Sequence, residues 1–158
     1  MIILGIDPGT RRIGYGVVES APAKLKLIRA GLLKIEGKDD FGAIQETKKQ
    51  IDAIIKKFKP AILSIEKIYF VKNQKTGIRV AEARGVIISS ALGSGLRIEE
   101  YNPNEVKAAL TGYGLADKKA VFKMVKLILK EPGLKIIDDA SDALALAIIA
   151  GHKSNLTG

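Results

Sequence analysis

Two short apolar runs that each end in a carboxylate constrain the fold of this chain more than any other feature. Residues 1–6 are followed by Asp7, and residues 61–65 are followed by Glu66. Runs of this length and character are typical of buried strands. A carboxylate at the end of such a strand costs free energy unless something pairs with it, so Asp7 and Glu66 are candidates for a functional site.

Two further acids, Asp139 and Asp142, lie where the apolar stretch 143–150 begins. Because they are three residues apart, they project from one face of the first turn of a helix. Three chain segments can therefore offer carboxylates to one point, and an oxygen-rich cluster of this kind suits one or two Mg²⁺ ions. Since two Mg²⁺ ions suit phosphodiester cleavage, these acids predict a metal-dependent nuclease.

Composition agrees with a small folded enzyme. A chain of 158 residues with 47% hydrophobic content is long enough for one domain with a real core. The apolar runs are too short to span a membrane, and we expect no signal peptide because the first run stops at an acid. Cysteine is absent, which excludes disulfides and cysteine metal sites and fits a cytoplasmic location. With a single histidine, His152, carboxylates are the abundant metal ligands.

The formal net charge of +9 suits a partner with a phosphate backbone. A basic surface around an acidic site is what a nucleic-acid substrate calls for. A basic protein with no nucleic-acid role would carry the same charge, so the charge supports the nuclease hypothesis without deciding it.

Periodicity and turn residues predict a mixed α/β architecture. Strands are expected over 1–7, 13–20, 25–36, 61–66 and 96–101. Helices are expected over 43–58, 74–92, from Asn102 as N-cap, from Asp117 to about 130, and over 139–150 before Gly151. Three consecutive strands followed by alternating helices and strands predict a mixed sheet with helices on both faces.

Short motifs run through the chain in a fixed order. They are Gly5-Ile6-Asp7-Pro8-Gly9-Thr10, Gly14-Tyr15-Gly16-Val17-Val18, Ile65-Glu66, Lys72-Asn73, Ala83-Arg84-Gly85, Tyr101 with Pro103, Val106-Lys107, Gly112, Gly114, Lys118, and Asp139-Ala140-Ser141-Asp142-Ala143-Leu144-Ala145. Together they resemble the RuvC-type Holliday junction resolvases over essentially the whole chain. The resemblance implies one RNase H-like nuclease domain over 1–158, a five-stranded mixed sheet, a homodimer, and Mg²⁺-dependent paired nicking of four-way DNA junctions.

The four acids match the acidic metal-site positions of that family, residue by residue. The resemblance implies that Asp7, Glu66, Asp139 and Asp142 hold two Mg²⁺ ions, for which Mn²⁺ can substitute. As a hypothesis, Asp7 bridges both ions, one of which generates the attacking hydroxide while the other stabilises the leaving 3′ oxygen. Two alternatives stay open: Asp139 could be a helix N-cap, and Asp138 could replace it as a ligand.

Candidate DNA contacts come from basic and aromatic residues. Lys107 and Lys118 match family positions near the scissile phosphate, where a cation would hold the strand and offset developing charge. Tyr69 is expected to stack on an unpaired base, whereas Phe70 is expected to pack in the core. The other candidates are Lys72, Asn73, Arg84, Lys119 and Lys123.

Several of these contacts have a structural alternative. Arg84 could anchor a phosphate or form an internal ion pair. Lys119 and Lys123 belong to a stripe with Lys126 and Lys130, which could track a backbone but is also typical of any solvated helix. Residues 85–92 are apolar nearly all round, which predicts a helix buried against more than one neighbour. In the family, dimer contacts lie near that helix.

Three other classes share some of these features. A YqgF-type nuclease has the same Asp-x-Gly-Thr opening, but the Glu66 block and the 139–145 motif favour the resolvase. Actin-like and sugar-kinase ATPases also share that opening, but need two such domains. A non-catalytic junction-binding module would keep the lysines and lose acids. The resemblance further implies RuvA and RuvB as partners, and paired nicks call for a two-fold dimer.

Overall fold

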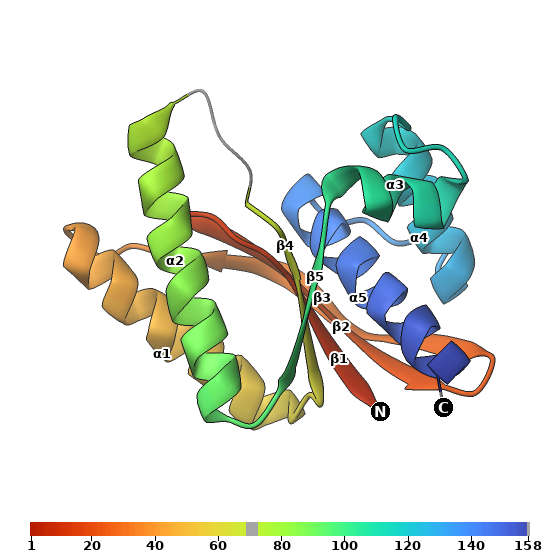
Figure 1. The fold of residues 1–158 in the computed structure, drawn as a ribbon, viewed down its shortest axis with the longest axis horizontal. Coiled ribbons are helices and arrows are strands. Elements are labelled where there is room, and N and C mark those ends of the chain that lie inside the picture. The colour runs from red at the N-terminus through yellow and green to blue at the C-terminus, as the bar shows by residue number, and fades with distance from the viewer. Residues whose placement is uncertain (69–72, 158) are drawn as a thin grey trace.

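A mixed β-sheet with helices on both faces forms the centre of the molecule (Figure 1). The computed structural model describes residues 1–68 and 73–157. Its elements are β1 (Ile2–Asp7), β2 (Arg12–Ala21), β3 (Lys24–Lys34), α1 (Asp40–Phe58), β4 (Ile62–Glu66), α2 (Gln74–Gly93), β5 (Arg97–Tyr101), α3 (Pro103–Thr111), α4 (Lys118–Leu129) and α5 (Asp138–Thr157). None of the described helices is long and apolar enough to cross a membrane.

Within the described residues the sheet has five strands in the order β3-β2-β1-β4-β5. The first three strands along the chain form an antiparallel meander, whereas β4 is parallel to both β1 and β5. Helices α1 and α2 cover one face, and α3, α4 and α5 lie on the other (Figure 1). The predicted five-stranded mixed sheet with helices on both faces is therefore confirmed.

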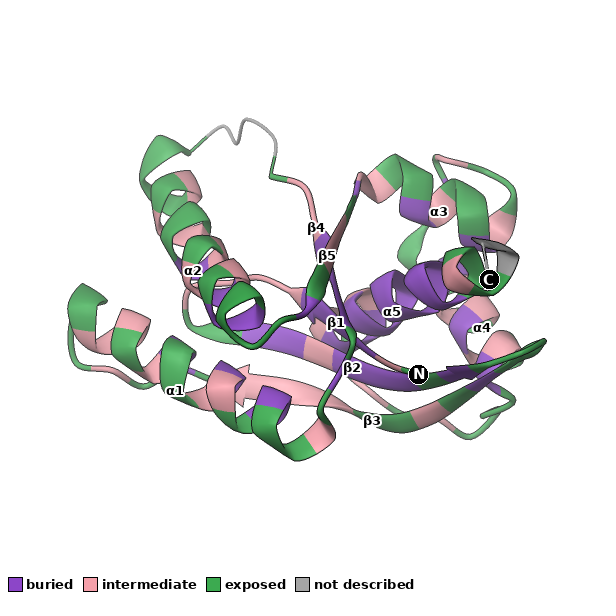
Figure 2. Ribbon diagram, turned by 60° about the horizontal axis from the view of Figure 1, so that its bottom comes forward, coloured by how far each residue is buried: buried purple, intermediate pink, exposed green. Residues whose placement is uncertain are grey.

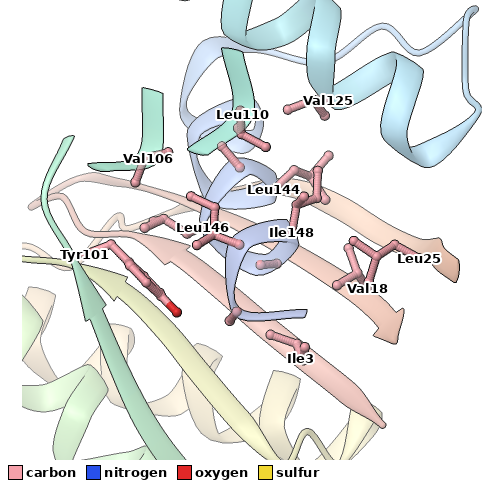
Figure 3. Close-up of a cluster of buried hydrophobic side chains, with 14 of the residues drawn as sticks. Ile3, Val18, Leu25, Tyr101, Val106, Leu110, Val125, Leu144, Leu146 and Ile148 are labelled. Atoms are coloured by element: carbon pink, nitrogen blue, oxygen red, sulfur yellow. The ribbon is translucent and has the colours of Figure 1, made fainter. Parts of the chain in front are cut away.

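Alternation along the strands separates two cores. Ile3 contributes to the core on the α5 side, and its neighbour Leu4 to the core on the α1–α2 side. Helix α5 is the centre of the first core, where Leu144 and Ile148 are fully buried (Figure 3). Each buried side chain of this size contributes about 1.5–3 kcal/mol, so α5 is held firmly to the sheet.

Helix boundaries differ from the prediction at two places. Helix α1 begins at Asp40 rather than at residue 43, because Asp39 is its N-cap and accepts a hydrogen bond of 2.7 Å from the Gly42 N–H. Helix α5 continues to Thr157 instead of ending before Gly151. A Cβ at Gly151 would lie 2.7 Å from Leu25 Cδ2, so this glycine allows the helix to pack closely rather than ending it.

Helix α2 leaves one apolar face exposed. Ala83, Ile87 and Ala91 are buried on the side that contacts α1 and β5, whereas Ile78 and Leu92 are each 60% exposed. The outward side of α2 is accordingly exposed over most of its length in Figure 2. Helix α2 contacts both α1 and β5, as predicted for residues 85–92, but Gly85, Ser89 and Leu92 are exposed, so this stretch is buried on one side only within the described chain.

Candidate active site

The parallel pairing of β1 and β4 brings Asp7 and Glu66 to the same edge of the sheet. Ile6 pairs with Ile65, so the two acids are the next residues on adjacent strands. Because side chains alternate along a strand, Asp7 lies on the same face as Ile3, which packs toward α5. Glu66 lies on that face by the same rule, and both side chains are partly buried. The sheet therefore directs both carboxylates toward the start of α5.

Glycines in β1 and β2 let the backbone of α5 approach the sheet. A Cβ at Gly14 would lie 2.0 Å from the Asp139 carbonyl oxygen, and a Cβ at Gly5 would lie 2.0 Å from the Ala143 carbonyl oxygen. Real Cβ atoms do not come this close, so any larger residue would push the helix away. These contacts fix the first turn of α5, and with it Asp139 and Asp142, beside the end of β1.

The carboxylates are close enough to perturb one another. Burial, together with the negative charges of Asp142, Glu66 and Asp139, raises the pKa of Asp7 from 3.8 to about 7. Burial is also the main cause of the raised pKa of Glu66, to which the Asp142 charge adds. The Asp142 pKa is raised by burial and partly restored by Lys118. The site therefore carries negative charge for which the protein itself supplies too little compensation.

Two cations partly balance this charge. Lys118 Nζ lies 3.4 Å from Asp142 Oδ2 and 3.9 Å from Asp138 Oδ2, and the Asp142 charge raises the Lys118 pKa. Arg12 Nε donates to Asp139 Oδ2 at 3.2 Å. Arg12 is not among the residues that the sequence predicts for the site. Its position directly after the turn between β1 and β2 places it near Asp7, but the sequence cannot distinguish such an arginine from an ordinary surface arginine.

Two hollows open beside the acids, and we refer to them together as the acidic cleft. One, with a volume of about 280 Å³, is lined by Asp7, Glu66, Pro103, Val106, Lys107, Lys118, Val121, Asp142 and Leu146. The other, of about 700 Å³, is lined by Asp7, Pro8, Gly9, Thr10, Arg11, Arg12, Lys118, Ile137, Asp138 and Asp139. Asp7 and Lys118 line both hollows, so the cleft extends to both sides of the end of β1.

The donor set fits a hard divalent cation by its chemistry. As the side chains stand, no group of three histidine, cysteine or acidic residues within 1–68 and 73–157 is arranged to hold a metal ion. Arg12 and Lys118 occupy oxygens of Asp139 and Asp142 that an ion would need. Carboxylate oxygens are nevertheless the ligands that Mg²⁺ prefers, and a cation would offset both the burial of the Asp7 charge and its repulsion by the other carboxylates, which together raise the Asp7 pKa.

Asp139 and Asp138 differ in their relation to this cluster. Asp139 is 31% exposed and its charge contributes to the raised Asp7 pKa, whereas Asp138 is 77% exposed and is not among the causes of that shift. Helix α5 begins at Asp138, so Asp139 lies inside the first turn and not at the N-cap position. Of the two acids, Asp139 has the better position for a ligand.

Two of the predicted DNA contacts have structural partners. Asn73 is the N-cap of α2, and its side chain accepts a hydrogen bond from the Thr76 N–H at 3.2 Å. Arg84 forms an ion pair with Glu100, and its Nε donates to the Glu66 carbonyl oxygen at 3.0 Å. The arginine thus makes the internal ion pair that the sequence left open, and it supports the strand end that carries Glu66.

The remaining predicted DNA contacts are distributed unevenly. Lys107 and Lys118 line the acidic cleft. Lys119 is exposed on α4, and Lys123 lines a separate hollow with Lys126 and Lys130. Lys72, together with the aromatic residues Tyr69 and Phe70, lies outside the described residues.

The chain is similar to known proteins over nearly its whole length. The family model described as crossover junction endodeoxyribonuclease RuvC matches residues 3–150. The RuvC proteins of Caldanaerobacter subterraneus subsp. tengcongensis and Brachyspira hyodysenteriae are 41% and 40% identical to this chain. Each alignment covers 99% of this chain, and 95% and 97% of the respective relative.

Solved structures give the same result. Thermus thermophilus RuvC has a TM-score of 0.90 at 26% identity, covering 99% of this chain and 97% of that one. T. thermophilus RuvC in complex with its Holliday junction substrate has a TM-score of 0.91, covering 99% of this chain and 96% of that one. The predicted RNase H-like fold is confirmed by these neighbours. Since a family model spans nearly the whole chain and full-length relatives share about two residues in five, the chain belongs to the RuvC family of crossover junction endodeoxyribonucleases.

Proposed function

We propose that this chain is a structure-specific endodeoxyribonuclease that resolves four-way (Holliday) DNA junctions in homologous recombination and DNA repair. The observation that carries the proposal is the convergence of carboxylates from β1, β4 and α5 beside Lys107 and Lys118. Support also comes from the T. thermophilus relative, whose solved complex contains a Holliday junction substrate. Residues 1–158 would act as one nuclease domain, since β1 and α5, from opposite ends of the chain, build the site jointly.

Two Mg²⁺ ions, or Mn²⁺ in their place, would be held by Asp7, Glu66, Asp139 and Asp142. When bound, such ions supply Lewis-acid stabilisation to a phosphodiester undergoing hydrolysis. Because Asp7 is buried among other carboxylates, the site has excess negative charge that the positive charge of the ions would neutralise. In the metal-free protein, Arg12 and Lys118 hold Asp139 and Asp142 in position by ion pairs.

Lys107 and Lys118 would hold the scissile phosphate. Both line the smaller hollow of the acidic cleft, and the positive charges of both lower the pKa of Glu66, so their ammonium groups lie near the carboxylates. A phosphate in this hollow offers Lys118 an alternative to Asp142. A cation fixed there stabilises negative charge that develops as the P–O bond breaks.

The active unit would be a homodimer. Resolving a junction into two duplexes requires two symmetric nicks, and a two-fold dimer supplies two equivalent sites. The outward face of α2 supports this proposal because Ile78, Ala81 and Leu92 are exposed there and Gly85 has no neighbouring atom within 4 Å of where a Cβ would be. A second copy could cover this apolar face by close helix packing. In the cytoplasm the dimer would work with the branch-migration proteins RuvA and RuvB, a partnership supported by family membership.

Cleavage of a labelled mobile four-way junction tests the proposal. The wild-type protein should make paired nicks on opposing strands with Mg²⁺ and none with EDTA. The Asp7→Asn variant should make none with Mg²⁺. Linear duplex and RNA–DNA hybrid of matching sequence serve as controls. Preferential cleavage of the hybrid, or tight junction binding without any cleavage by the wild type, would contradict a resolvase function.

A further inference from the structure

We propose that a second cleft, between the N-terminal ends of α1 and α2, binds backbone phosphates of the DNA strand that leaves the active site. This inference rests on the proposed function. The cavity, called the α1–α2 cleft below, has a volume of about 410 Å³. Its polar lining residues are Thr10, Arg11, Asp40, Thr47, Lys75, Thr76, Arg79 and Glu82. Thr10 and Arg11 also line the larger hollow of the acidic cleft, so the two clefts meet at these residues.

The turn between β1 and β2 separates the two clefts and is held rigidly. A Cβ at Gly9 would lie 2.0 Å from the Arg12 carbonyl oxygen, so only glycine allows this turn to be so tight. The Arg11 carbonyl oxygen accepts a hydrogen bond of 2.9 Å from the Ile35 N–H, and the Arg11 guanidinium donates to the Gly37 carbonyl oxygen. Arg12 contacts Asp139 in the acidic cleft, whereas Arg11 lines both clefts at the point where they meet.

Cations in the α1–α2 cleft differ in how far their charge is compensated. Arg79 forms an ion pair with Asp40 and is 31% exposed. Arg11 donates its side-chain hydrogen bond to the neutral Gly37 carbonyl group and forms no ion pair with the described residues, which leaves its charge available. Lys75 is exposed and likewise forms no ion pair within the described part of the chain. Apart from Asp40, Glu82 is the acidic residue that lines the cleft, so it offsets part of this positive charge.

The start of α2 adds to the attraction for an anion. The first turn of α2 contains no acidic residue, although α1 has Asp40 in the equivalent turn. Lys75 stands in that first turn, where the positive end of the helix dipole makes a cation unfavourable for the helix itself. A phosphate beside Lys75 would offset both the ammonium charge and the dipole. The hydroxyls of Thr10 and Thr76, which line the same cleft, are suitable donors to phosphate oxygens.

A strand with its scissile phosphate near Lys118 would cross the turn at Thr10 and enter the α1–α2 cleft. Contacts to phosphates there fix the position and direction of the strand without reading its sequence. The cleft should therefore contribute to junction affinity and to its salt dependence. Removing Lys75 should leave the chemical step unchanged, because Lys75 lines only the α1–α2 cleft and not the acidic cleft.

The test is the salt dependence of junction binding, measured in EDTA so that no strand is cut. Lys75→Gln should lower the slope of log Kd against log salt concentration by about 1, the value for one lost phosphate contact on duplex DNA. Lys26→Gln, which removes the same charge from an exposed position on β3, is the matched control. A second variant, Lys75→Glu, should weaken binding further while leaving the melting temperature equal or higher, because an acid suits the first turn of α2.

The outcomes separate the two proposals. A reduced slope for Lys75→Gln, a wild-type slope for Lys26→Gln, and unchanged cleavage rates at saturating protein would support the α1–α2 cleft. If the wild type binds and cleaves the junction but the Lys75→Gln slope equals that of Lys26→Gln, the cleft proposal is overturned and the resolvase function stands. If the wild type neither binds nor cleaves a four-way junction, the proposed function fails and the cleft proposal fails with it.

Discussion

Replacing Asp7 by Asn should make the metal-free protein more stable while abolishing cleavage. In the fold, burial and the neighbouring carboxylates raise the Asp7 pKa from 3.8 to about 7. Since one pKa unit corresponds to about 1.4 kcal/mol, the ionised carboxylate destabilises the fold by at most about 4 kcal/mol. Asn has nearly the same shape and no charge, so it removes this penalty.

The pH dependence follows from the direction of the shift. Because the folded pKa is raised above the unfolded value, folding favours the protonated carboxyl group of Asp7. The penalty is therefore absent below the unfolded pKa, grows as the pH rises through the window between the two pKa values, and is complete above the folded pKa. Asp7→Asn should gain up to about 4 kcal/mol at pH 8 but only up to about 2 kcal/mol at pH 5.

Thermal unfolding in EDTA at both pH values measures the effect. For a domain of this length, a gain of 4 kcal/mol raises the melting temperature by about 8 to 16 °C. Asp52→Asn is the matched control, since a hydrogen bond from Lys48 lowers the Asp52 pKa and its loss should destabilise slightly. An Asp7→Asn variant that is no more stable than wild type at pH 8, or whose gain is equal at both pH values, would refute the reasoning.

Three further predictions follow from the site and the surface. Adding Mg²⁺ should raise the melting temperature of the wild type but have little effect on Asp7→Asn, as differential scanning fluorimetry would show. Lys118→Gln should lower the single-turnover cleavage rate by about 10²–10³-fold with a smaller change in junction Kd, and equal losses in both would argue against a transition-state role. Leu92→Glu should convert a dimer to a monomer in analytical ultracentrifugation, whereas Leu127→Glu, equally exposed at 60% on α4, should not.

The positions of Asp7 and Glu66 could be predicted from the sequence because strand alternation and parallel pairing are simple rules. An acid that ends each of two apolar runs lies at one edge of the sheet whenever the strands are parallel neighbours, as β1 and β4 are. The partners of Arg12 and Arg84 could not be predicted, because Asp139 and Glu100 are distant from them in sequence. Gly151 was misjudged because glycine ends many helices and permits close packing in others.

The glycines of β1 and β2 explain why the acids meet at all. Asp139 and Asp142 come from a helix, and a helix normally packs on a sheet at a distance set by intervening side chains. At Gly5 and Gly14 there is no side chain, so the carbonyl groups of α5 lie where Cβ atoms would otherwise be. The closer approach buries Asp7 and moves the acids of α5 toward it, and this burial and the resulting repulsion together raise the Asp7 pKa. The packing that fixes α5 against the sheet therefore also makes ionisation of Asp7 unfavourable. A bound cation would reverse this effect, so the need for a cation follows from the packing of the core itself.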